Sequence, residues 1–247
     1  METERSAGGD GEDRHTDCGT FKKEKAMKVK DSSRGLYSGK VGGWIYYVRD
    51  GRGYVRSLPD PKKYEPSEKQ RATNERFRAV QGFYKFFREK VSPDIWSVAA
   101  KAEGKMGSNL FFSRNCRCFD GRGTLVDAGA FQFSEGSLAP LTLPEVEPLG
   151  GGRFRVRWQP CEEMTTAAAT DRLRVGVVRL GLVDRGEQDW QLRGAYWAEE
   201  ERGARGDGEG EFLVEKWDEV AETHAYLLFE RADGLAWSPS RHVALEL

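Results

Sequence analysis

Residues 35–70 restrict the fold of this chain more than any other segment. Their central part is an aromatic and β-branched run, residues 44–49, and such residues favour strands. The sequence Asp-Gly-Arg-Gly at 50–53 follows, and glycine tolerates the positive φ angles of tight turns. Residues 54–58 then supply a return strand, so the segment predicts a β-hairpin. A lone hairpin is only marginally stable in water, so we expect it to pack against another element.

A helix is predicted directly after this hairpin. Ser67 and Gln70 have the spacing of a capping box, in which each side chain satisfies a backbone N–H of the other residue. We expect this helix to continue to about residue 90, with an apolar face formed by Phe77, Val80, Tyr84 and Phe87. A second helix is expected from Ser92-Pro93 to about residue 110, because serine is a good N-cap and proline suits the first helical position.

The C-terminal part of the sequence is rich in short strand patterns. Strands are predicted at residues 125–133, 153–158, 173–180, 191–199, 210–214, 223–231 and 240–247. Three prolines make residues 138–148 an expected extended connector, and residues 203–210 are an expected flexible loop. Short strands at this spacing favour an antiparallel sandwich, with Trp158 as a candidate core residue.

These patterns together predict an α+β protein. Residues 34–135 are expected to form a β-hairpin and helical-hairpin module. Residues 136–247 are expected to form an immunoglobulin-like or fibronectin-like antiparallel β-sandwich. Residues 1–33 are polar and predict a disordered tail, and we expect residues 1–26 to be an extension that precedes Met27.

Composition and charge restrict the class of protein. The chain lacks an apolar signal segment and any run of about 18 apolar residues, so we expect no membrane span and, by default, a cytoplasmic protein. The net charge of −1 is unevenly distributed, since residues 21–90 contain 19 basic and 8 acidic side chains. This basic segment indicates either nucleic-acid binding or a solvated face that contacts the acidic half of the same protein.

The sequence contains no recognisable metal, cofactor or catalytic motif. Four cysteines are expected to be reduced thiols, and Cys116-x-Cys118 lacks the C-x-x-C spacing of redox and zinc sites. His15, His224 and His242 are scattered along the chain. We predict that His224 is a structural residue of an apolar strand rather than a general base. The acidic clusters 162–163 and 199–201 are expected to be solvated.

The strongest candidate binding residues lie in and beside the predicted hairpin. They are Lys40, Trp44, Tyr46, Tyr47, Arg49, Arg52, Tyr54, Arg56, Lys62 and Lys63. Basic residues interleaved with aromatic ones suit phosphate neutralisation and base stacking. The same alternation also suits a hairpin with one buried and one solvated face. The glycines at 39, 42 and 43 precede a strand and not a helix N-terminus, so we interpret them as turn or close-packing positions and not as a phosphate loop.

The chain also resembles a known family. The residues that carry the resemblance are Ser38-Gly39-Lys40-Val41-Gly42, Tyr54-Val55-Arg56-Ser57-Leu58-Pro59, Glu68-Lys69-Gln70 with Arg76-Phe77, Ser134-x-Gly136-Ser137-Leu138, Ala169-Thr170-Asp171, Ala225-Tyr226-Leu227-x-Phe229, Ala232-Asp233-Gly234 and Ser238. Over about residues 34–247 they resemble the domain-of-unknown-function 6266 family of uncharacterised proteins from Bacteroidetes-type bacteria. Members usually have an Asn-Pro-Arg-Thr-like run where this chain has Tyr64-Glu65-Pro66-Ser67. The resemblance implies no catalytic residue.

The sequence thus leads to two functional hypotheses. The first is a non-enzymatic binding or structural protein that mediates protein–protein contacts in an assembly, without a cofactor. The alternative is a nucleic-acid-binding protein that uses the basic N-terminal half. The sequence specifies neither the partner nor the oligomeric state.

Overall fold

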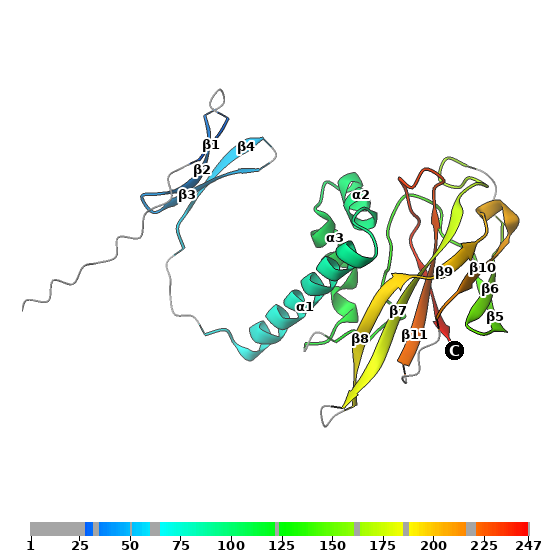
Figure 1. Ribbon diagram of the computed structural model, residues 1–247. Coiled ribbons are helices and arrows are strands. Elements are labelled where there is room, and N and C mark those ends of the chain that lie inside the picture. Colours follow the sequence, from blue (N-terminus) through cyan, green and yellow to red (C-terminus); the bar gives the residue numbers. More distant parts are fainter. Residues whose placement is uncertain are drawn as a thin grey trace, which may run out of the picture. The chain divides into compact units, whose positions relative to one another are not determined.

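The computed structural model contains three α-helices and three four-stranded antiparallel sheets within its described residues (Figure 1). It describes residues 28–31, 35–49, 51–59, 65–121, 124–160, 164–184, 188–215 and 221–246. The prediction of a mixed α+β protein is therefore confirmed. The chain divides into two compact units, Met1–Glu65 and Pro66–Leu247. This division differs from the expected boundary at residues 135 and 136.

The first unit contains a sheet in the order β1-β2-β3-β4. Its strands are β1 (Lys28–Asp31), β2 (Leu36–Val41), β3 (Trp44–Arg49) and β4 (Arg52–Ser57). The predicted hairpin is present as β3 and β4, and Gly42 and Gly43 adopt positive φ angles of 53° and 85° in the turn before it. The tail prediction is wrong for residues 28–31, because β1 pairs with β2 through its backbone. Residues 1–27 lie outside the described residues.

The second unit begins with the predicted capped helix, α1 (Glu68–Lys90). The Ser67 N–H donates to Gln70 Oε1 at 2.9 Å, and Ser67 Oγ accepts from the Gln70 N–H at 3.4 Å, so the capping box is confirmed. Val80, Tyr84 and Phe87 are buried as predicted. Phe77 is 48% exposed and does not belong to the buried face.

The second predicted helix is divided into two. Ser92 Oγ accepts from the Ile95 N–H at 3.4 Å at the start of α2 (Ile95–Ala102). Gly104, with a φ angle of 63°, lies in the break before α3 (Gly107–Asn115), and a short 3₁₀ turn, η1 (Cys116–Cys118), follows. The expected continuous helix is wrong at this point because glycine at a positive φ terminates a helix.

The remaining strands form two further sheets. One has the order β5 (Glu145–Gly150), β6 (Arg153–Arg157), β10 (Glu209–Leu213), β9 (Glu199–Arg202). The other, called the central sheet below, has the order β12 (Arg241–Leu245), β11 (Ala221–Glu230), β7 (Arg172–Asp184), β8 (Gln188–Trp197). Both are antiparallel throughout.

Alternating side chains of the central sheet enter two different hydrophobic cores. Val175 and Val177 pack with side chains of the sheet β5-β6-β10-β9, including Trp158. Val178 and Leu180, on the other side of β7, pack with the helices. Figure 1 shows the helices on one side of the central sheet and β5, β6, β9 and β10 on the other. The helices and both sheets therefore form one layered unit.

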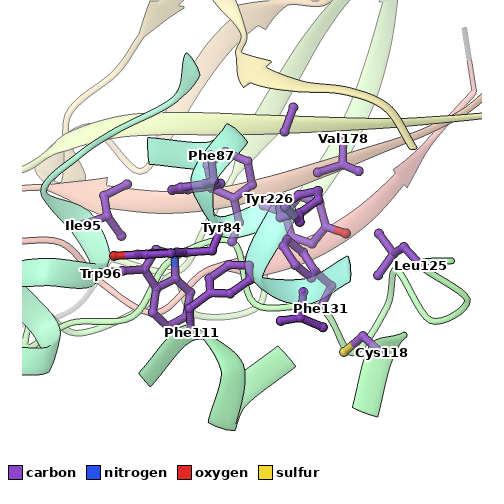
Figure 2. Packing of buried hydrophobic residues seen from close by; sticks show 14 of the residues in the cluster. Tyr84, Phe87, Ile95, Trp96, Phe111, Cys118, Leu125, Phe131, Val178 and Tyr226 are labelled. Carbon is purple, nitrogen blue, oxygen red and sulfur yellow. The ribbon is translucent and has the colours of Figure 1, made fainter. Parts of the chain in front are cut away.

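Aromatic rings dominate the contact between the helices and the central sheet. Figure 2 shows Phe87 and Phe111 from the helices close to Phe131 and Tyr226. Phe133, which is completely buried, stacks on Tyr226 with 5.6 Å between ring centroids and meets Phe87 edge-on at 4.9 Å. A Cβ at Gly176 would overlap the Phe133 ring, so this position of β7 must remain glycine for the ring to lie against the strand. This packing explains why the expected domain boundary at 135 and 136 does not divide the unit.

Two segments between the helices and β6 differ from their predicted conformations. Residues 125–133 form no strand, because Asp127 Oδ1 accepts from the Ala130 N–H at 2.9 Å and closes a turn. The expected connector 138–148 contains part of β5, an edge strand in which Pro148 is tolerated because edge positions need not donate to a neighbouring strand.

The expected flexible loop 203–210 is anchored in the core. It contains a 3₁₀ turn, η2 (Arg205–Asp207), and Arg205 is only 3% exposed. Its guanidinium Nε lies 3.0 Å from Asp171 Oδ2, and its backbone carbonyl accepts from Trp158 Nε1 at 2.9 Å. A buried ion pair with these hydrogen bonds fixes the loop, which its charged composition did not indicate.

We predict that Phe133→Ala lowers the free energy of unfolding by about 3–5 kcal/mol, the usual cost of removing a buried phenylalanine ring. Chemical denaturation of the full chain measures this change. Phe77→Ala is the matched control, because its ring is 48% exposed, and we expect it to cost less than half as much. Equal losses for the two variants would contradict the central position of Phe133.

Candidate functional site

The register of β3 and β4 sorts the candidate binding residues onto two sides of the N-terminal sheet. Pairing is unbroken from Trp44↔Ser57 to Arg49↔Arg52. Successive side chains of a strand point to opposite sides, and directly paired residues share a side. We call one side the apolar face: Val41, Trp44, Tyr46, Val48 and Val55. We call the other the basic face: Lys40, Ile45, Tyr47, Arg49, Arg52, Tyr54 and Arg56.

The basic face combines cations with a stacked pair of aromatic rings. Tyr47 and Tyr54 lie directly opposite each other, with 5.5 Å between ring centroids and 17° between ring planes. Their side chains are 39% and 43% exposed. Arg52 and Arg56 are exposed two residues to either side of Tyr54 on β4. Because β2, β3 and β4 contain no aspartate or glutamate, this face is positive.

The apolar face presents large side chains to solvent. Val41 and Trp44 are direct cross-strand partners and are 48% and 50% exposed. Val55, which pairs with Tyr46, is 53% exposed. About half of each side chain thus remains in water, although the alternation places these residues where a sheet normally packs on a core.

The structure brings together only part of the predicted binding set. Lys40, Tyr47, Arg49, Arg52, Tyr54 and Arg56 share the basic face, whereas Trp44 and Tyr46 lie on the opposite one. Lys62 and Lys63 lie outside the described residues. Val41 and Val55 were not among the predicted binding residues, although period-2 alternation in the hairpin identifies them as residues of the apolar face.

Two of the three histidines, which the sequence analysis described as scattered, are in contact. His224 Nδ1 lies 3.0 Å from His242 Nε2, across β11 and β12. Burial lowers the pKa of both imidazoles, while the nearby carboxylates of Glu222 and Asp127 act in the opposite direction. The sequence could not show this pair because it depends on the register of β11 with β12. His15 lies outside the described residues.

The acidic cluster 199–201 was expected to be solvated, but the structure shows that Glu201 is partly buried. Glu201 accepts from the Val175 N–H at 2.7 Å, and its Oε2 lies 2.6 Å from Arg174 Nε. Arg174 also pairs with Glu230 at 3.0 Å and lies over the Trp197 ring, 4.3 Å from its centroid. Burial raises the pKa of Glu201 to about 7. Arg174 and the Val175 N–H act to lower this pKa and the Glu230 carboxylate acts to raise it, so the shift is the ordinary effect of burying a carboxyl group in an ion-pair network and is not by itself a sign of catalysis.

The Glu201 side chain lines neither of two surface cavities found in the second unit. One cavity, of about 220 Å³, lies between the end of α2, residues 135–137 and Trp237. The other, of about 290 Å³, lies over β9 and β10. Both are at or below the small end of the usual ligand-pocket range, which begins at about 300 Å³.

The described cysteines also lack the features of a reactive site. Cys116 and Cys118 are free. Burial, assisted by the charge of Asp127, raises the pKa of the Cys118 thiol to about 11. Because the thiolate is the reactive form of cysteine, Cys118 is an unreactive core residue at neutral pH. Cys18 and Cys161 lie outside the described residues.

Comparison with known proteins gives no identification. No protein-family model, curated protein or solved structure matches this chain. In the part of the chain that the structure describes, no helix is both long and apolar enough to cross a membrane.

Proposed function

We propose that this chain is a non-enzymatic binding protein that contacts another protein in an assembly through the apolar face of its N-terminal sheet. The observation that carries the proposal is the exposure of Val41, Trp44 and Val55, which are 48%, 50% and 53% exposed on one side of the sheet. Contiguous exposed apolar side chains indicate an interaction surface. Tryptophan is also among the residues that contribute most to binding energy at protein interfaces.

The second unit supports this proposal as a scaffold. Two four-stranded antiparallel sheets share a core that includes Trp158, an arrangement in keeping with an immunoglobulin-like or fibronectin-like sandwich used as a binding module. Fold alone does not determine function, so the argument for binding rests on the N-terminal sheet.

Membership of the domain-of-unknown-function 6266 family is also a proposal. Residues that carry the resemblance have structural contacts here: Asp171 pairs with Arg205, and Ser134 Oγ donates to the Ser238 carbonyl at 2.7 Å. A Cβ at Gly136 would overlap the Trp237 carbonyl. These contacts give the resemblance a structural basis, and they suit a family whose common residues maintain a fold rather than perform catalysis.

We predict that Trp44→Glu abolishes partner binding, because it replaces the largest exposed side chain of the apolar face with a charge. The full chain is recovered from its native cells with cross-linked partners, which are quantified by mass spectrometry and then tested for direct binding with purified components. Removing an interface tryptophan that contributes 2 kcal/mol or more weakens binding about thirtyfold.

Tyr47→Glu is the matched control for this experiment. It adds the same charge to the same strand at a half-exposed aromatic residue of the opposite face. Loss of the partner in the Trp44 variant alone supports the proposal. Retention of the partner by both variants would contradict the proposal. It would also be contradicted if the purified chain turned over a substrate and a point substitution abolished this activity.

The basic face supports a second candidate function, binding of single-stranded nucleic acid. The specific observation is the exposed Tyr47–Tyr54 stack between Arg52 and Arg56. Aromatic rings offer stacking surfaces for bases, and arginines neutralise the adjacent phosphates.

For this candidate we predict binding of labelled single-stranded DNA or RNA that weakens with salt, measured by fluorescence anisotropy at 50 and 200 mM salt. Each neutralised phosphate contributes about 0.7 to the slope of log K against log salt, so Arg52→Gln should reduce the slope by about that amount. Tyr54→Ala should remove about 1–3 kcal/mol of stacking without changing the slope. Trp44→Ser, on the other face, is the control. Binding that is absent or insensitive to salt would exclude this function.

A further inference from the structure

The pair His224–His242 is positioned by strand pairing. Tyr226 is the direct partner of His242, and Ala244 is the direct partner of His224. The two histidines are therefore diagonal neighbours on the same side of the central sheet, where side chains of this size reach each other. Their near nitrogens, Nδ1 of His224 and Nε2 of His242, are 3.0 Å apart.

Each imidazole has a carboxylate in its vicinity. Glu222 Oε2 is 3.5 Å from the far nitrogen of His224, Nε2. Asp127 Oδ1 and His242 Nδ1 lie 3.5 and 3.9 Å from the position that a Cβ would occupy at Gly129, and the charge of Asp127 acts to raise the pKa of His242, so this carboxylate is in the vicinity of the His242 ring. Histidines that bind metals usually have a carboxylate or carbonyl on the second ring nitrogen, which orients the ring and increases its basicity.

The distance between the near nitrogens is close to what a bridging ion requires. Metal–nitrogen bonds of about 2.0–2.1 Å at a tetrahedral angle place two nitrogens about 3.3 Å apart. The two imidazoles must therefore separate by about 0.3 Å, a small rotation for His242, which is half-buried on the edge strand β12. The Tyr226 hydroxyl is engaged, since it donates to the Ala128 carbonyl at 2.8 Å.

We propose that His224 and His242 form a binding site for a divalent transition-metal ion of the imidazole-preferring class, such as Zn²⁺, Ni²⁺ or Cu²⁺. The ion takes the place of the proton that the two near nitrogens share in the hydrogen bond, and that proton moves to the far nitrogen of the ring that donated it, so both imidazoles remain neutral. Among the described residues, no group of three or more His, Cys, Asp and Glu side chains converges on one point, so water completes the coordination. The site is independent of the function proposed for the N-terminal sheet.

The lowered pKa values of the two histidines favour the neutral imidazoles that bind metal ions at neutral pH. Burial lowers the pKa of both histidines, and the charge of protonated His224 lowers that of His242 further. The charged groups that face the pair, Glu222 on β11 and Asp127 in the loop before Phe131, act against this shift without reversing it. Because metal ligation requires the neutral imidazole, binding should weaken only as the pH falls below the ordinary histidine range, towards the lowered pKa values of the two rings.

The test is isothermal titration of the full chain, without an affinity tag, with Zn²⁺ at pH 7.5 and 5.5. We expect one saturable site at pH 7.5, weaker binding at pH 5.5 and at least tenfold weaker binding for His242→Asn. Glu222→Gln should weaken binding about tenfold, the usual lower limit for removal of a supporting carboxylate. His15→Asn is the matched control and should bind as the unaltered chain does.

Nitrogen chemical shifts of the histidine rings in the unaltered chain give a second readout that does not depend on the stability of any variant. Zn²⁺ should shift His224 Nδ1 and His242 Nε2. Equal binding by the unaltered chain and His242→Asn, or unchanged ring shifts at saturating Zn²⁺, would overturn the proposal.

Discussion

The burial of the central sheet on both sides is the constraint on which the second unit depends. Val178 and Leu180 on one side of β7 lie among the aromatic rings of the helices, and Val175 and Val177 on the other side lie among the side chains of the opposing sheet. Phe133 connects the layers, because its ring lies against Gly176 and stacks on Tyr226. Neither the helices nor the second sheet can be removed without exposing half of the central sheet to water.

Local signals in the sequence predicted the elements well. The capping box at Ser67 and Gln70 and the turn between β3 and β4 depend on residues that are neighbours in the chain, so their chemistry can be identified without knowledge of the fold. The alternation of charged and apolar residues in β6 was equally clear, because every second side chain of a strand with one buried side is apolar.

Long-range contacts explain the features that the sequence did not reveal. The contact division at Glu65 and Pro66 differs from the expected boundary at residues 135 and 136, and the sequence pattern gives no sign that Phe133 packs on Gly176, 43 positions later in the chain. The charged loop around Arg205 was misjudged because its buried partner, Asp171, belongs to a distant segment. For the candidate site, the residue types were identified, but their separation into two faces and the contact of His224 with His242 depend on strand register.

The two units differ in a way that bears on function. The second unit buries its aromatic rings, its charged pair Asp171–Arg205 and its unreactive Cys118 thiol within a layered structure. The N-terminal sheet instead leaves Trp44 and Tyr54 about half exposed on opposite faces. Exposed aromatic residues stabilise a fold little but contribute strongly to binding, and this contrast is the basis on which we propose the sheet as the binding element and the second unit as its scaffold.

The layered packing requires the helices and the two sheets of the second unit to unfold as one cooperative unit. Native-state hydrogen exchange of the full chain, measured with increasing denaturant, tests this by comparing α1 with β11. We predict that amides of both elements reach the same opening free energy and the same denaturant dependence, because neither can separate without exposing the core around Phe133. If α1 exchanged through a separate opening of clearly lower free energy while β11 remained protected, the helices would be an independent module and the account would be contradicted.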